Sequence, residues 1–234
     1  MSATPLPKLI LLPGLDGSGV FFAPVLAALD GKASAQVLTY PADGTQTYDA
    51  LASRILPLLP DAGDYVLLGE SFAGPLAILL ATRARHKPKA LILSASFVRN
   101  PFPMMGMVIN ATLPGFLASK PLPILEATLL RKGDHQMAWD IFQSLSKLKT
   151  DVLSARVKTA MVTDVRKELA ALPLPVLYLQ GRHDKLVSSA QGELVRQTGR
   201  KVQIARTDTP HFVLQYDVDT TVEQHILPFL SGLS

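Results

Sequence analysis

Six short apolar runs, separated by longer segments with helical spacing, constrain the fold of this chain more than any other feature. Most of the runs are nearly continuous in apolar residues, which is typical of parallel strands that are covered on both faces. The strands expected from these runs span 8–13, 35–40, 65–69, 90–94, 176–181 and 202–207. The expected helices span 21–29, 48–59, 73–85, 188–198 and 220–230. The alternation predicts an α/β fold with a doubly wound, mostly parallel sheet of about six strands.

One long segment, 102–172, interrupts this alternation between the fourth and the fifth expected strands. Its first part is rich in proline, and its second part has apolar residues at helical spacing. Those residues are Ala138, Ile141, Phe142, Leu145, Leu148, Val152, Leu153, Val157 and Met161. We therefore expect a helical cap insertion at 102–172, on a core formed by 1–101 and 173–234.

Composition excludes several classes of protein. The 23 Lys and Arg against 19 Asp and Glu leave a net charge of +4 without a dense basic tract, which argues against a nucleic-acid partner. The absence of cysteine excludes disulfides, a thiolate metal site and a cysteine nucleophile. The chain has no apolar run of the ~20 residues that a membrane span requires, and no secretory signal is visible. We expect a soluble, cytoplasmic protein of undetermined oligomeric state.

The segment Gly69-Glu70-Ser71-Phe72-Ala73-Gly74 is the sharpest local motif. It follows one expected strand and opens the next helix, so that Ser71 would lie on a tight strand-to-helix turn with its hydroxyl above the sheet edge. Small residues are needed two positions on either side, where strand and helix nearly touch, and Gly69 and Ala73 meet this need. The helix N-terminus favours developing negative charge. The motif predicts a nucleophilic serine rather than a serine that only caps a helix.

A serine hydroxyl needs a base, and an imidazole base needs an acid to orient it. Of the five histidines, His211 lies in the loop after the sixth expected strand, where the chain reaches the carboxyl edge of the sheet. Asp184 follows the fifth strand, and parallel strands end at the same edge, so Ser71, Asp184 and His211 should meet there. Asp208 is the alternative acid, but it is only three residues before His211 and is better placed to stabilise its own loop.

The oxyanion formed during acyl transfer needs two N–H donors. The backbone N–H of Phe72, directly after the serine, is the first candidate. The glycine-rich loop 12–19 after the first strand would supply the second, from Leu15 or alternatively from Asp16. This loop lacks the lysine and the glycine spacing of a nucleotide-binding turn. We expect no cofactor and no metal.

Together, the order Ser71, Asp184, His211, the strand–serine–helix turn, the Pro-Gly-Leu-Asp-Gly loop and the helical insertion resemble the α/β-hydrolase superfamily, over 8–230. The resemblance implies a serine hydrolase whose cap follows the fourth strand. This chain has Ala73 where the family usually has glycine, and Pro13-Gly14 where many relatives have His-Gly. It also begins at the strand that is third in the full family fold, so we expect the first hairpin to be missing.

The function expected from these residues is hydrolysis of carboxylic esters or thioesters through an acyl-serine intermediate. Ser71 excludes the dehalogenases and epoxide hydrolases of the superfamily, which use an acid as nucleophile. Acyltransferases, cofactor-free haloperoxidases and C–C hydrolases share the same three residues and stay open, as does a non-catalytic binding protein. Met105 and Phe116 are candidates for an apolar acyl pocket, although they could equally join the cap to the core. The positive charge would suit an acidic partner such as an acyl carrier protein.

Overall fold

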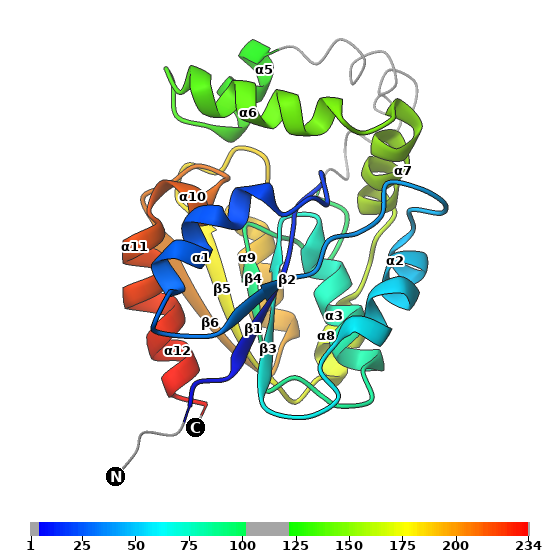
Figure 1. The fold of residues 1–234 in the computed structure, drawn as a ribbon, viewed down its shortest axis with the longest axis vertical. Coiled ribbons are helices and arrows are strands. Elements are labelled where there is room, and N and C mark those ends of the chain that lie inside the picture. Colours follow the sequence, from blue (N-terminus) through cyan, green and yellow to red (C-terminus); the bar gives the residue numbers. More distant parts are fainter. Residues whose placement is uncertain (1–4, 102–121, 234) are drawn as a thin grey trace.

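The computed structural model describes residues 5–101 and 122–233 and places a parallel sheet at the centre of the molecule (Figure 1). Its six strands have the spatial order β2-β1-β3-β4-β5-β6, and every neighbouring pair is parallel. The strands are β1 (Lys8–Leu12), β2 (Ala35–Val37), β3 (Tyr65–Glu70), β4 (Ala90–Ser94), β5 (Pro175–Gly181) and β6 (Lys201–Thr207). This is the predicted doubly wound α/β fold.

Helices cover both faces of the sheet (Figure 1). One face packs against α2 (Tyr48–Ile55), α3 (Ala73–Arg83), α8 (Arg166–Ala171) and α9 (Ser189–Thr198), with the short turn η2 (Leu56–Leu58) after α2. The other packs against α1 (Ala23–Leu29), α10 (Val213–Tyr216), α11 (Val218–Thr221), η3 (Val222–Ile226) and α12 (Leu227–Ser231), with η1 (Val20–Phe22) leading into α1.

The central strands β1, β3, β4 and β5 are nearly continuous in apolar residues because each of them buries both of its sides. In β1, Ile10 and Leu12 enter the core on the α3 side, while Leu9 and Leu11 enter the core on the α1 side. Every residue of β3 is buried. At ~25 cal/mol per Å² of buried apolar surface, these two layers are the main source of stability.

Four helices lie between β4 and β5 in the described part of the chain: α5 (Leu122–Leu129), α6 (His135–Ser146), α7 (Thr150–Met161) and α8. Helices α5 and α6 lie beyond the carboxyl ends of the strands, and α7 descends beside the core (Figure 1). Towards the end of this segment, Ala160, Val165 and Leu169 pack with the residues around α3. Among the described residues, no helix is long and apolar enough to cross a membrane.

Most elements begin or end within a few residues of the expected positions, and two differences have a clear physical cause. The second strand ends at Val37 rather than residue 40, because the chain then turns away and the Tyr40 N–H donates to the Gly17 carbonyl. The last helix is divided into α11, η3 and α12. Pro228 lies in this segment and has no N–H to donate to the preceding turn, which favours an irregular helix there.

Candidate active site

Ser71 lies on the turn between β3 and α3 with a positive φ of 50°. A non-glycine residue in this region stores strain of roughly 1–3 kcal/mol, so the surrounding structure must hold it. The Ser71 N–H donates to the Ser94 carbonyl at 2.8 Å, which extends the β3–β4 pairing by one residue. Its carbonyl accepts from the Ser96 hydroxyl at 2.6 Å and from the Gly74 N–H at 3.2 Å. The backbone of the turn is therefore fixed on all sides.

The turn is also tightly packed. A Cβ added to Gly69 would lie 2.6 Å from the Ala73 carbonyl oxygen, and one added to Gly74 would overlap the Ser96 hydroxyl. Ala73 itself is fully buried in the core, so its methyl group is accommodated there. The requirement at Gly74 was not foreseen from the sequence, because Ser96 comes from the loop after β4.

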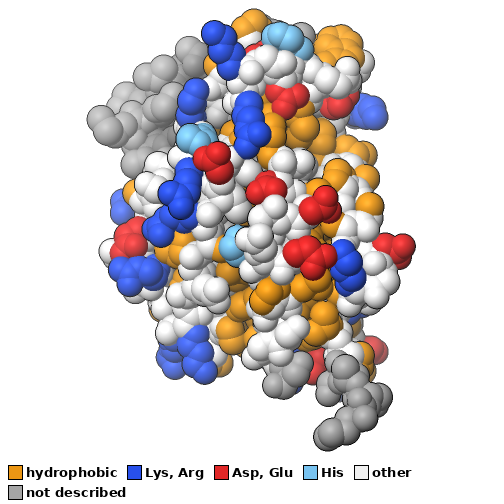
Figure 2. All heavy atoms as spheres, turned by 90° about the vertical axis from the view of Figure 1, so that its left-hand side faces the viewer, with side chains coloured by type: hydrophobic (Ala, Val, Ile, Leu, Met, Phe, Trp, Pro, Cys, Tyr) orange, Lys and Arg blue, Asp and Glu red, His pale blue; other side chains and the backbone are white. Residues whose placement is uncertain are grey.

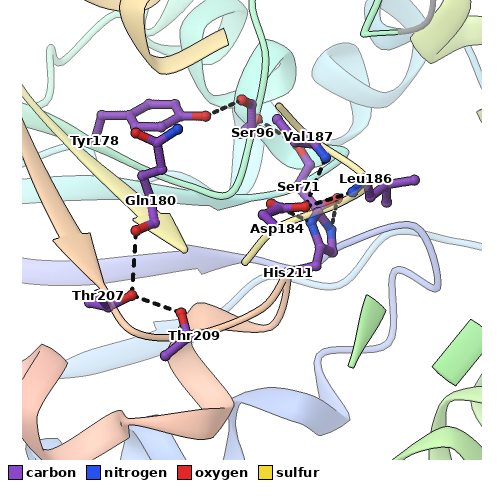
Figure 3. A network of polar contacts seen from close by, with 10 residues as sticks. All are labelled: Ser71, Ser96, Tyr178, Gln180, Asp184, Leu186, Val187, Thr207, Thr209 and His211. Atoms are coloured by element: carbon purple, nitrogen blue, oxygen red, sulfur yellow. Dashed lines mark hydrogen bonds and ion pairs between the residues drawn. The ribbon is translucent and has the colours of Figure 1, made fainter. Parts of the chain in front are cut away.

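His211 joins Ser71 to Asp184 (Figure 3). Its Nε2 lies 2.9 Å from the Ser71 hydroxyl, and its Nδ1 lies 2.8 Å from Oδ2 of Asp184. The other oxygen of Asp184 accepts the N–H groups of Leu186 and Val187 at 2.9 and 2.8 Å. Since a carboxylate can only accept, Nδ1 carries the proton and Nε2 is free to accept one from Ser71. The structure brings together the three residues proposed from the sequence.

Asp208 and the remaining histidines lie elsewhere. Asp208 is exposed and pairs with His183 at 2.7 Å, not with His211. His135 is exposed and pairs with Glu126, while His86 contacts the Gly63 carbonyl. His211 and Asp184, in contrast, have side chains that are only 5% and 3% exposed. Burial shields their hydrogen bond from competition by water.

Backbone N–H groups near Ser71 remain available. The glycine-rich loop comes close to the serine, since a Cβ on Gly14 would lie 3.9 Å from that of Ser71. Within the described ranges, the N–H groups of Phe72, Leu15 and Asp16 donate to no other protein group. The Phe72 carbonyl is held by the Tyr48 hydroxyl at 2.7 Å, which fixes the backbone beside the serine. Unpaired N–H groups beside Ser71 can donate hydrogen bonds to a negatively charged oxygen that forms there.

The comparison with protein families agrees with this geometry. The family described as "Serine aminopeptidase, S33" (Hydrolase_4) matches residues 41–212, which is well over half of the chain. The chain belongs to this family of α/β-hydrolases. A protein named "Putative carbamate hydrolase RutD", from Serratia proteamaculans, is 26% identical over 242 residues, covering 89% of each chain.

Solved structures with low sequence identity share the hydrolase fold. A hydrolase from Oleispira antarctica has a TM-score of 0.81 at 12% identity, covering 99% of this chain and 93% of that one. A lipase-esterase related protein from Clostridium acetobutylicum has a TM-score of 0.77 at 12% identity, with 100% and 96% covered. The enol-lactonase from Burkholderia xenovorans has a TM-score of 0.71 at 16% identity, with 100% and 92% covered.

Glu70, directly before the serine of this hydrolase, is a buried carboxyl group that sequence reasoning overlooked. Its Oε1 accepts from Nε2 of Gln215, in α10, at 2.9 Å. Burial raises the pKa of Glu70 from 4.5 to about 7, although the Gln215 hydrogen bond and nearby His211 partly oppose this, while Asp16 adds to it. The only signal in the sequence was its position at the end of a fully apolar strand.

An apolar layer lies between α6 and the core. Its buried members are Leu130, Ala138 and Ile141, and Phe21 and Phe212 pack against them. The Phe212 ring forms T-shaped contacts with two other rings. Its centroid lies 5.6 Å from that of the Phe21 ring and 5.8 Å from that of the His211 ring. The layer therefore reaches the imidazole. The predicted pocket residues Met105 and Phe116 lie outside the described residues, and the described ones contain no group of side chains suited to a metal.

Proposed function

We propose that this hydrolase cleaves carboxylic esters or thioesters through an acyl-serine intermediate. The continuous hydrogen-bonded chain from the Ser71 hydroxyl through His211 to Asp184 carries this proposal. It supplies a nucleophile, a base within reach of its proton and an acid that orients the base. The strained turn and the free N–H groups of Phe72 and Leu15 support the same reading.

In the first half of the reaction, Ser71 Oγ attacks the acyl carbon while its proton moves to Nε2 of His211. The electron pair of the carbonyl moves onto oxygen, and the N–H groups of Phe72 and Leu15 stabilise this oxyanion, with Asp16 as the alternative second donor. Asp184 stabilises the protonated imidazole without taking its proton. When the carbonyl re-forms, the bond to the alcohol or thiol breaks, and His211 returns the proton to the leaving group.

In the second half, water attacks the acyl-serine and gives its proton to His211. The tetrahedral intermediate collapses, the acid is released and Ser71 regains its hydrogen. Transfer of the acyl group to an alcohol or amine would use the same residues with a different acceptor. The nature of the acceptor thus separates the hydrolase from an acyltransferase.

We further propose that 102–172 acts as a cap that selects the acyl chain. The position of α5 and α6 beyond the carboxyl edge supports this (Figure 1), as does the apolar layer that reaches His211. Replacing Met105 or Phe116 by Ala should reduce activity on long acyl chains more than on acetyl esters, because each buried methylene contributes about 0.8 kcal/mol. Rates on a series of p-nitrophenyl esters measure this. Equal losses on short and long esters would make these residues structural.

The surface gives less support for a macromolecular partner than the site gives for a small acyl substrate. Figure 2 shows the side of the molecule formed by α11 and α12, where acidic and basic side chains are interspersed. Lys32 and Glu223 (in η3) form an exposed ion pair at 2.5 Å. An acyl carrier protein therefore stays a proposal that rests on the net charge of +4. Comparing an acyl-CoA with the matching acyl carrier protein thioester tests it.

The deciding experiment combines labelling with a substrate panel. An active-site-directed fluorophosphonate should label the wild type and Ser231→Ala, a variant of an exposed serine, but not Ser71→Ala. The panel contains p-nitrophenyl esters, acyl-CoA thioesters and an aryl carbamate, the last chosen because of the relative named as a carbamate hydrolase. Turnover of esters or thioesters that depends on Ser71 is the expected result. Turnover of the carbamate alone, or labelling that persists in Ser71→Ala, would contradict the proposal.

A further inference from the structure

Arg156, on α7, is a charged side chain that is completely buried. Its guanidinium donates to three oxygens from two loops of the core: Nη1 to the Leu15 carbonyl at 2.8 Å, Nη2 to the Pro41 carbonyl at 3.1 Å and Nε to Oε1 of Gln46 at 2.9 Å. It also lies 5.3 Å from the centre of the Tyr40 ring. An insertion helix thus reaches into the loop that follows β1.

The contact with the Leu15 carbonyl fixes the orientation of a peptide group. In a trans peptide the C=O and the following N–H point in opposite directions, so the Asp16 N–H points away from Arg156. The preceding peptide is held as well, because the Gly14 carbonyl accepts from the Gly17 N–H at 3.1 Å and from the Tyr40 hydroxyl at 3.4 Å. The Leu15 N–H therefore points away from these two donors.

The loop has little freedom to adopt another arrangement. Gly17 has a φ of 71°, and a Cβ there would lie 2.7 Å from Nη1 of Arg156, so the guanidinium occupies the space that a side chain would need. A second insertion helix holds the same loop, since the Ser144 hydroxyl of α6 donates to Oδ2 of Asp16 at 3.0 Å. The same oxygen accepts the Ser18 N–H at 3.1 Å.

We propose that Arg156 is a positioning residue for the oxyanion hole: it holds the loop 14–17 so that the N–H supplied by Leu15, or alternatively by Asp16, faces the oxyanion. This inference rests on the proposed acyl-serine mechanism. It gives the insertion a role in the chemical step in addition to substrate selection. Arg156 itself touches neither substrate nor Ser71, and acts only through the peptide groups that it orients.

The chemistry of this position favours arginine. The planar guanidinium presents several donors in a fixed geometry, which suits carbonyls from two different loops. Lysine would keep the positive charge but would lack the planar arrangement of donors. Methionine would leave the carbonyls of Leu15 and Pro41 without a hydrogen-bond donor. Unpaired buried carbonyls are unfavourable, so we expect the loop to move until they find new partners.

The test compares Arg156→Met and Arg156→Lys with Thr159→Val. Thr159 lies one turn further along α7, and its hydroxyl donates to the Gln46 carbonyl at 3.1 Å, so its loss loosens the insertion without touching the loop 14–17. The wild type should hydrolyse a p-nitrophenyl ester in a Ser71-dependent manner. For Arg156→Met, kcat should fall about 10–100-fold with little change in KM, the size expected when a reacting group is misplaced by about 1 Å. Arg156→Lys should lie in between, and Thr159→Val should keep the wild-type kcat.

Affinity for a trifluoromethyl ketone provides a readout that a merely structural role would not change. Its adduct with the serine places an oxyanion where the hole must bind it, so inhibitor affinity should fall in parallel with kcat/KM in the Arg156 variants. If Arg156→Met does not fold, Ser144→Ala loosens the other side of the loop and should lower kcat and ketone affinity together. Unchanged kcat and ketone affinity in the folded variants would overturn the inference. Absence of Ser71-dependent turnover in the wild type would instead overturn the proposed function.

Discussion

Replacing Glu70 by Gln tests how the central strand accommodates an ionisable group beside the nucleophile. Glu70 is the last residue of β3 and is 6% exposed. Burial raises its pKa from 4.5 to about 7. A glutamine of the same length keeps an oxygen to accept from Gln215, but it cannot ionise. The variant therefore resembles the wild type with Glu70 protonated, at every pH.

The sign and size of the effect follow from these two pKa values. Because the pKa in the folded state lies above that in the unfolded chain, the folded protein binds this proton more tightly. The contribution of Glu70 to stability is complete below about pH 4.5 and is lost as the pH rises through about 7. Each unit between the two values corresponds to about 1.4 kcal/mol, so the loss approaches about 3 kcal/mol by about pH 8. Glu70→Gln should escape this loss.

Urea unfolding of both proteins between about pH 5 and pH 8 measures the prediction. The free energy of unfolding of Glu70→Gln relative to wild type should rise by about 2–3 kcal/mol over this range. Glu223→Gln is the matched control, since the Glu223 side chain is 52% exposed and forms a surface ion pair with Lys32. The difference between this variant and the wild type should vary much less with pH than that for Glu70→Gln. A constant difference for Glu70→Gln as well would refute the reasoning, because the folded-state pKa would then be near its ordinary value.

Two further substitutions test the site and its packing. Asp184→Asn should lower kcat on a p-nitrophenyl ester about 10³–10⁴-fold, because an amide favours the wrong tautomer of His211, whereas Asp208→Asn should keep the wild-type rate. If Asp208→Asn lowered kcat more than Asp184→Asn, Asp208 would be the carboxylate that orients His211. Gly69→Ala should lower the free energy of unfolding by about 1–3 kcal/mol through overpacking against the Ala73 carbonyl, while Gly232→Ala, where a Cβ meets only ordinary contacts, should be nearly neutral in thermal unfolding.

The central strands of the sheet could be predicted because burial on both sides determines their residues. The run at 65–69 became β3 with one more residue, Glu70, since Tyr65 and Leu67 enter one core and Val66 and Leu68 enter the other. The convergence of Ser71, Asp184 and His211 could be predicted for a related reason. Parallel strands end at one edge, so three loops that follow three strands meet there whatever the details of their packing.

The buried face of α7 was less predictable. Apolar spacing pointed to Val152, Leu153, Val157 and Met161, but Val157 is only partly buried, and Arg156 faces the core instead. Arg156 does continue the stripe of Val152 and Leu153 at a helical spacing of three to four residues. A charged residue is normally assigned to the solvent side, because burying an unpaired charge is strongly unfavourable. Its burial is explained by acceptors far away in the sequence, namely the Leu15 and Pro41 carbonyls and the Gln46 side chain.

Arg156 and Glu70 are both buried ionisable side chains in the region of the candidate active site, but pH affects their charges differently. The guanidinium stays protonated throughout the range in which enzymes are assayed, so its hold on the loop 14–17 does not vary with pH. The Glu70 carboxyl group ionises near neutral pH, so its effect on the turn between β3 and α3 does vary with pH. The fold-loss of kcat caused by Arg156→Met should therefore be the same at about pH 5 and pH 8, whereas the loss of stability relieved by Glu70→Gln should grow steadily over this range. The two groups can thus be separated by pH in one set of unfolding and rate measurements.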